Sequence, residues 1–166
     1  MSSLVPSSER LNRILALWND LRAGMEIPLR STFSPLDVPP KDLPHLILLD
    51  VFNAGADFRY RLVGTGVVSF VGHEFTGLSI SKYQDMHEEP EMIDQYVVSA
   101  RDRRPTLYSG SLKRFDKEHV LYERLALPLL GEGDAPEVTQ ILAAFEFRYA
   151  SREFDGDRST AVSDAR

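Results

Sequence analysis

The sequence predicts an α+β domain in which helices pack on a five-stranded antiparallel sheet, preceded by an amphipathic helix. Two segments repeat apolar residues every three or four positions, as one face of a helix does. Five short segments are apolar or alternate apolar and polar residues, as strands do. These segments occur in the order helix, two strands, short helices, helix, three strands. Because helices separate the second and third strands, these two strands need not be neighbours in the sheet.

Length and composition limit the classes of protein to which the chain can belong. Its 166 residues fit one domain. A net charge of -6, from 19 basic and 25 acidic residues, argues against a nucleic-acid-binding domain. The absence of cysteine excludes disulfides, thiolate metal sites and cysteine nucleophiles. We expect a cytoplasmic protein without a signal peptide, and no apolar run is long enough to span a membrane.

The first helix is expected over residues 9–23. Ser7 or Ser8 can cap its start, and Gly24 suits the left-handed residue that ends a helix. Its apolar face repeats at helical spacing through Leu11, Ile14, Leu15, Trp18 and Leu21.

Residues 25–44 form a proline-rich connector. Prolines lack an N–H donor and restrict the preceding residue, so neither a helix nor a central strand fits here. Apolar residues interleave with the prolines, and we therefore expect an ordered segment packed on the domain. This gives three parts: the helix and connector at residues 1–44, the core at 45–149, and a polar, disordered tail at 150–166.

The core begins with a hairpin and then becomes helical. Residues 45–52 are expected as a buried strand, and residues 57–63 as a half-buried partner strand after a turn. Four glycines around a short apolar piece indicate short helical turns over residues 64–78. Residues 90–102 have the spacing of a second amphipathic helix.

Three strands are expected to close the core, over residues 106–114, 119–129 and 139–147. Asp116 and Lys117 suit a tight turn between the first two. The second strand alternates strictly, with Val120, Tyr122, Arg124 and Ala126 on one face.

Two motifs make the prediction more specific. The first comprises Trp18, Arg22, Gly24, Pro28, Arg30, Phe33 and Pro35, and continues to Leu43 and Pro44. The second comprises Phe58 to Leu62, Gly64, Thr65, Gly72, Glu74, Phe75, Thr76 and Gly77. Together they resemble the signatures of a group of bacterial PAS-like proteins, mainly from alphaproteobacteria and often stand-alone. The resemblance implies a PAS-like fold and a sensory or interaction module without catalytic activity.

We expect structural roles for the motif residues. Trp18 should anchor the first helix against the sheet or against a partner helix. Arg22 and Arg30 should tie down the connector through bonds to carboxylates or carbonyls. The glycines should supply backbone freedom after the second strand. The remaining structural positions that the motifs mark are Arg61, Gly64, Gly72, Glu74 and Gly77.

A ligand pocket is the main candidate site. Six side chains lie on strands or on the second helix, and could line an apolar pocket with a few polar tips if they face the same space. The alternative is a filled core in which the hydroxyls bond to backbone groups. The six candidates are Tyr60, Tyr96, Tyr108, His119, Tyr122 and Phe145.

Motifs for metal or cofactor binding are weak. The four histidines lack metal-ligand spacing, so we expect no metal site. Among them His87 lies closest to the position of a haem-binding histidine in PAS domains, although a solvated histidine is favoured. Haem and non-covalently bound flavin therefore stay open without support, whereas cofactors attached through cysteine are excluded. Nucleotide-binding and hydrolase motifs are absent, and we assign no catalytic residue.

Three functional hypotheses follow. The first is a non-catalytic sensory module that binds a small metabolite, a signalling protein or both, and dimerises through its N-terminal helix. With only a short tail after the last strand, its output should pass through protein contact, or the protein should act by titrating a ligand. The second is a small cone-type isomerase or dehydratase, with Asp50, His119 or Glu123 as acid or base. The third is a ligand-free interaction scaffold, for which a solid core and an exposed apolar patch would be the sign.

Overall fold

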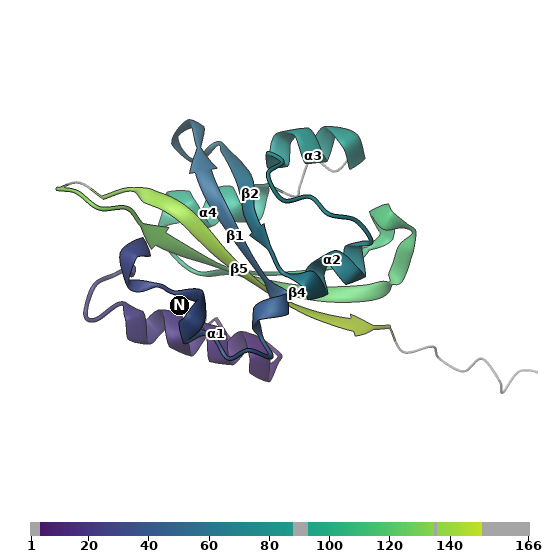
Figure 1. Cartoon of the computed structure of the whole chain (residues 1–166), viewed down its shortest axis with the longest axis horizontal. Coiled ribbons are helices and arrows are strands. Elements are labelled where there is room, and N and C mark those ends of the chain that lie inside the picture. Colours follow the sequence, from purple (N-terminus) through teal and green to yellow (C-terminus); the bar gives the residue numbers. More distant parts are fainter. Residues whose placement is uncertain (1–3, 88–92, 135, 151–166) are drawn as a thin grey trace, which may run out of the picture.

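The five expected strands form one antiparallel sheet in the order β2-β1-β5-β4-β3 (Figure 1). The computed structural model describes residues 4–87, 93–134 and 136–150, without the side chains of residues 84–87. Strands β2 and β3 lie at opposite edges of the sheet, which agrees with the helices placed between them in sequence. The strands are β1 (Leu46–Phe52), β2 (Asp57–Val63), β3 (Thr106–Leu112), β4 (Lys117–Leu130) and β5 (Val138–Tyr149).

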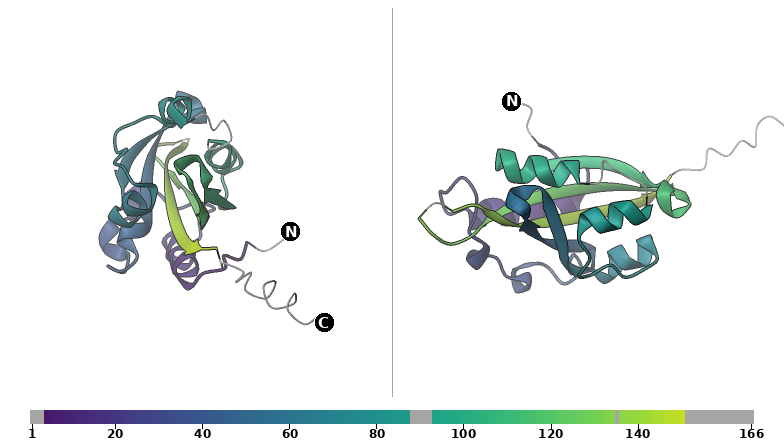
Figure 2. Two further views of the ribbon diagram at one scale, coloured as in Figure 1. Left: turned by 90° about the vertical axis from the view of Figure 1, so that its right-hand side faces the viewer. Right: turned by 90° about the horizontal axis from the view of Figure 1, so that it is seen from above.

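Helices cover both faces of the sheet (Figure 2). Helix α1 (Glu9–Leu21) and the connector lie on one face, which we call the outer face. The other three helices lie across the opposite, inner face. They are α2 (Thr65–Val71), α3 (Ile80–His87) and α4 (Asp94–Asp102). The fold class predicted from the sequence, α+β with helices packed on a five-stranded antiparallel sheet and an N-terminal helix, is confirmed.

Alternation along the strands divides the core into two clusters. On β4, Val120, Tyr122 and Ala126 join the inner cluster with β1, β2 and the helices above them. Leu125, Leu127 and Leu129 point the other way into the outer cluster. Because successive side chains point to opposite faces of a strand, one stretch of β4 supplies both clusters.

Helix α1 packs on its own sheet. Ser8 caps it, with Oγ accepting from the Leu11 N–H at 3.1 Å. Leu11, Ile14 and Trp18 are buried in the outer cluster, and Trp18 Nε1 donates to the Pro128 carbonyl at 2.9 Å. Trp18 was expected to anchor α1 either against the sheet or against a partner helix. In the structure it anchors α1 against the sheet of its own protomer, where the apolar face of the helix is buried.

The connector runs extended between three short 3₁₀ turns. These turns are η1 (Arg30–Thr32), η2 (Pro35–Asp37) and η3 (Leu43–His45). The Leu130 N–H donates to the Pro28 carbonyl at 3.0 Å, which joins the connector to the end of β4. Ile27, Phe33 and Val38 are buried in the outer cluster, so the segment forms part of the core.

Helix α3 is an element that the sequence pattern did not predict. Its first turn is capped by a residue far away in sequence, since Asp57 accepts from the Ser81 N–H at 3.2 Å and from Ser81 Oγ at 2.7 Å. Its apolar Ile80 and Tyr83 are buried in the inner cluster. A helix that depends on a tertiary cap and on two buried side chains leaves little local signal.

Smaller differences concern the ends of elements. Helix α4 is described from Asp94, and the expected start of this helix at residues 90–92 lies outside the described residues. Strand β3 ends at Leu112, because η6 (Lys113–Phe115) and a left-handed Asp116 make the turn that was expected at Asp116 and Lys117. Residues 151–166 of the expected tail also lie outside the described part of the chain.

Asp42 joins α1 to the end of the connector. Its side chain is 0% exposed and accepts from Arg13 Nε at 2.9 Å and from Arg13 Nη2 at 2.8 Å. Arg10 Nε donates to the same carboxylate at 3.3 Å. The hydrogen bonds from Arg13 keep the pKa of Asp42 below its usual value, although burial acts in the opposite direction. The ionised carboxylate therefore stabilises the folded state.

We expect Asp42→Asn to lower the free energy of unfolding by about 2 kcal/mol at neutral pH. This is below the usual cost of breaking a buried ion pair, because both arginines keep contact with water. Since the pKa is lowered on folding, the contribution is present above about pH 4 and is lost as the pH falls through the folded-state value. Urea denaturation over a pH series should show that the free energies of unfolding of Asp42→Asn and the wild type become equal in acid. Glu9→Gln, which removes only an exposed partner of Arg13, is the control and should change the free energy of unfolding little. Equal stability of Asp42→Asn and the wild type at neutral pH would contradict the stabilising role assigned to the Asp42 carboxylate.

Candidate functional site

The inner face carries a buried arginine. Arg124 on β4 is 4% exposed, and its Nε donates to Gln95 Oε1 on α4 at 2.6 Å. The Gln95 amide in turn donates to the carbonyls of Arg124 and Thr106, at 3.0 and 3.2 Å. Both ends of the Gln95 amide are thus used, which fixes the guanidinium relative to α4 and β3.

Aromatic rings surround this guanidinium. Its carbon lies 4.6 Å from the ring centroid of Tyr96 and 5.2 Å from that of Tyr108. The rings of Tyr122 and Phe145 follow at 5.9 and 6.0 Å. A delocalised guanidinium is weakly hydrated and is attracted to the faces of aromatic rings, so these contacts offset part of the cost of burying its charge.

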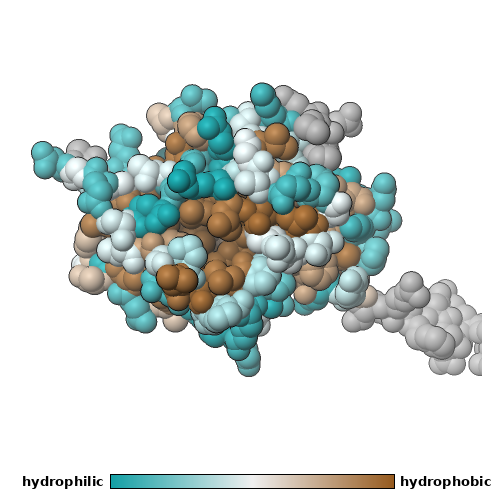
Figure 3. Space-filling model, in the orientation of Figure 1, coloured by the Kyte–Doolittle hydropathy of each residue, from teal (hydrophilic) through white to brown (hydrophobic). Residues whose placement is uncertain are grey.

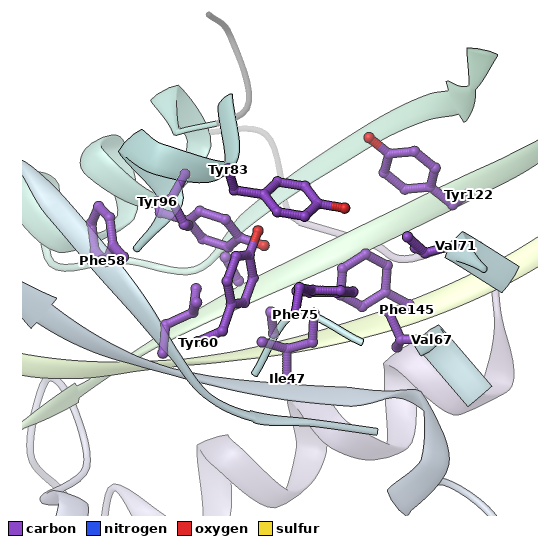
Figure 4. Packing of buried hydrophobic residues seen from close by; sticks show 14 of the residues in the cluster. Ile47, Phe58, Tyr60, Val67, Val71, Phe75, Tyr83, Tyr96, Tyr122 and Phe145 are labelled. Carbon is purple, nitrogen blue, oxygen red and sulfur yellow. The ribbon is translucent and has the colours of Figure 1, made fainter. Parts of the chain in front are cut away.

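A small cavity adjoins the ring of aromatic side chains. Its volume is about 20 Å³, which is room for a single water molecule. Figure 4 shows Tyr60, Tyr83 and Tyr96 gathered above the sheet on this side. Polar groups at the cavity come from the tyrosines and from two arginines. Its lining includes Tyr60, Tyr83, Tyr96, Tyr122, Arg114, Arg124, Phe75 and Phe145.

Burial keeps the tyrosine hydroxyls protonated. It raises the pKa of Tyr60 well above the ordinary value and also raises the pKa values of Tyr96 and Tyr122. Removing a phenolate from water is unfavourable, so the neutral form is retained. These hydroxyls are therefore available as hydrogen-bond donors and acceptors at neutral pH.

The structure brings together four of the six expected pocket residues. Tyr60, Tyr96, Tyr122 and Phe145 line the cavity. Tyr108 contacts Arg124 at the margin but is exposed. His119 lies elsewhere, exposed on β4 and stacked on Tyr149 with ring centroids 6.1 Å apart. It precedes Val120 by one position in the alternation, so its side chain points to the opposite face.

Sequence reasoning missed several members of the cluster. Arg124 shares its strand face with Val120, Tyr122 and Ala126, and this alternation was a signal that it points inward. Phe75 and Tyr83 gave no such signal, because they belong to a loop and to the unpredicted helix α3. Arg114 belongs to η6, the turn that was expected to be strand.

A second hollow lies on the outer face. We call it the outer groove; its volume is about 390 Å³ and its walls are nearly all apolar. Phe33, Pro35, Leu43 and Pro44 of the connector form one side, and the strands form the other through Leu46, Leu48, Leu62 and Leu142. Figure 3 shows hydrophobic residues gathered in the middle of this view. Leu36, which directly follows the groove residue Pro35, is 92% exposed.

Two motif arginines are the ends of one polar chain on the outer face. Arg30 donates to the Gln140 side-chain oxygen and to the Phe33 carbonyl. The Gln140 amide donates to Asp50 Oδ1 at 2.6 Å, and Arg61 pairs with Asp50 Oδ2 at 3.2 Å. The chain thus links the connector to β5, β1 and β2, a structural role of the kind expected for Arg30 and Arg61.

The other motif residues have local contacts. The Arg22 guanidinium lies 5.5 Å from the Trp18 ring centroid, and its Nη1 donates to the Glu26 carbonyl at 3.5 Å. Glu74 accepts from Thr76 Oγ1 at 2.6 Å and from two backbone N–H groups. These bonds, chiefly those from Thr76, lower its pKa.

The motif glycines differ in why they are needed. Gly72 ends α2 at φ +100°, and Gly77 has φ +87°, so both use the left-handed region. Gly64 has an ordinary φ of -65°, and the expectation of backbone freedom is wrong for it. A Cβ there would lie 2.3 Å from the Pro44 carbonyl oxygen. Gly64 is needed because η3 passes too close for any side chain.

The three acid or base suspects of the enzyme hypothesis do not share a cavity. Asp50 belongs to the outer polar chain, and Glu123 accepts from the Ser7 N–H at 2.8 Å. His119 is exposed on β4. No three His, Asp or Glu side chains in the described part of the chain gather as metal ligands, and the side chain of His87 lies outside it.

Comparison with known proteins decides the family. A family model for the PAS domain matches residues 6–143, which is most of the chain. The chain belongs to the PAS domain family. No curated protein and no solved structure shows a significant match to it.

Membership sets the general class of function. PAS domains are typically sensory and regulatory modules without catalytic activity, and they commonly mediate protein interactions. The match begins before α1 and includes the connector, so both belong to the PAS domain as it occurs here. Among the described residues of this PAS domain, none of the helices has the length and apolar character to cross a membrane.

Proposed function

We propose that this PAS domain is a cytoplasmic regulatory module of bacterial signalling that acts through contact with protein. The observation that carries the proposal is the outer groove with the exposed Leu36 beside it. Large apolar hollows at a protein surface usually mark sites of interaction. The inner cavity beside Arg124 supports the same conclusion, since its volume of about 20 Å³ is too small for a metabolite.

Self-association through the N-terminal segment is part of the proposal. The sequence pointed to α1, but the structure buries Leu11, Ile14 and Trp18 of that helix against β4 and β5. A second copy would therefore meet the part of the N-terminal segment whose apolar side chains stay exposed. The connector, with Leu36 on η2, meets this requirement.

The test is native mass spectrometry combined with an absorption spectrum of freshly purified protein. We expect masses of the bare polypeptide, including a dimer, and no absorption band in the visible range. A haem band, a flavin spectrum or a stoichiometric bound metabolite would overturn the proposal in favour of a ligand sensor.

A second candidate function is the binding of a small anion on the inner face, which requires the side chains around the cavity of about 20 Å³ to move apart. The observation that favours it is the pair of guanidinium groups, Arg114 and Arg124, that line one cavity together with tyrosine hydroxyls. Guanidinium groups bind carboxylates and phosphates with two parallel hydrogen bonds. If a bound acid is found, Arg124→Met should release it, whereas Arg59→Met, at an exposed arginine over Phe52, should retain it.

A further inference from the structure

We propose that the outer groove receives Leu36 from a second copy of this chain, in a symmetric dimer. The inference rests on the self-association proposed above and assigns the surface that makes it. We call Leu36 and its η2 turn the knob. The knob and the groove belong to the same face, because Phe33 and Pro35, which shortly precede Leu36 in sequence, are groove walls.

The knob is held in place although it is exposed. Ser34 Oγ accepts from the Leu36 N–H at 3.2 Å, and the Ser34 N–H donates to Asp37 Oδ2 at 3.1 Å. Pro35 fixes its own φ at the first position of the turn. A side chain presented on a rigid turn loses little conformational entropy on binding, which favours it as an anchor.

The groove is equally fixed. One wall is the sheet, where Leu62 of the edge strand β2 pairs with Leu48 and is still 44% exposed. The opposite wall contains Leu43 and Pro44, whose backbone is in close contact with Gly64. A preformed hollow with walls of leucine, proline and phenylalanine suits an aliphatic side chain, and its volume of about 390 Å³ also leaves room for the residues beside that side chain.

Symmetry makes the match reciprocal. In a two-fold dimer both copies use the same surface patch. The knob of each copy can therefore face the groove of the other copy. Each copy then gives one Leu36 and receives one. An unrelated partner would need its own apolar anchor and would leave the exposed Leu36 of this chain unused.

Charges at the rim also fit a second copy. Asp37 is exposed next to Leu36, and Arg61 is exposed next to Leu62. Although Arg61 pairs with Asp50 at 3.2 Å, its side chain remains 59% exposed and can contact another carboxylate. Entry of Leu36 against Leu62 brings Asp37 of one copy towards Arg61 of the other, and opposite charges across a contact fix its register.

The first test uses cross-linking, because the chain has no cysteine of its own. Leu36→Cys and Leu62→Cys are prepared separately, mixed and oxidised. We expect a disulfide-linked dimer that contains one chain of each kind. Val5→Cys in place of Leu36→Cys is the matched control, since Val5 is an exposed apolar residue outside the knob and should give little of this product.

The second test measures assembly by sedimentation over a concentration series. Leu36→Asp should weaken dimerisation about tenfold or more without loss of thermal stability, because Leu36 has almost no contacts within the protomer. Val5→Asp should assemble like the wild type. A wild type that stays monomeric at high micromolar concentration would refute self-association itself. A wild-type dimer that Leu36→Asp leaves unchanged, and that gives no mixed disulfide, would refute only the assignment of this surface.

Discussion

Gly64→Ala is expected to lower the free energy of unfolding by about 3 kcal/mol or more, and to prevent folding if the wild type is marginally stable. The added Cβ would lie 2.3 Å from the Pro44 carbonyl oxygen, 2.5 Å from the Pro44 carbonyl carbon and 2.9 Å from the Leu43 carbonyl oxygen. These are backbone atoms of η3, which cannot turn away as a side chain can. Urea denaturation followed by circular dichroism measures the loss.

Gly24→Ala is the matched control. Nothing lies within 4 Å of a Cβ at that position, and its φ of +87° makes the substitution strained rather than blocked. We expect a loss of about 1 kcal/mol, the usual cost of a left-handed non-glycine residue. Equal losses for the two variants would show that the close contact between Gly64 and η3 does not limit stability.

Trp18→Ala is expected to cost about 3–5 kcal/mol, the range for removing a large buried aromatic side chain. Trp18 is buried in the outer cluster, and its loss also leaves the Pro128 carbonyl without the donor at 2.9 Å. Because these contacts lie within one protomer, the loss should not depend on protein concentration. Thermal and urea denaturation at two concentrations measure both quantities.

Trp18→Phe separates the two contributions. It keeps most of the apolar contact and removes the N–H donor, so an intermediate loss of about 1–3 kcal/mol is expected for the unsatisfied carbonyl. A loss for Trp18→Ala that appears only at concentrations where a dimer forms would instead place Trp18 between two copies.

Much of the fold could be predicted because its signals are local. The apolar spacing of α1 and the alternation along β2, β4 and β5 depend on residues within each segment. Helix α3 escaped prediction because Asp57, far away in the chain, caps it. The PAS resemblance came from two motifs, and the structure shows that they touch where Gly64 meets Leu43 and Pro44.

The candidate site was predictable only in part. Tyr60, Tyr96, Tyr122 and Phe145 could be chosen because tyrosine and phenylalanine on strands or helices commonly face a core. Which of them meet depends on strand register, and a shift of one residue reverses the direction of every side chain. Register excluded His119 and brought Arg124 inside, although both lie on β4.

The sequence by itself determined the class of fold, the family motifs and the exclusion of cysteine chemistry, because each follows from residue type or local spacing. Only the tertiary structure decided how the apolar side chains are used. It buried the apolar face of α1 in the protomer and left Leu36 exposed beside the outer groove. The physical reason is that burial depends on which segments pack together. Leu11 of α1 and Leu36 of the connector are equally hydrophobic as residue types, but the sheet covers only the first of them.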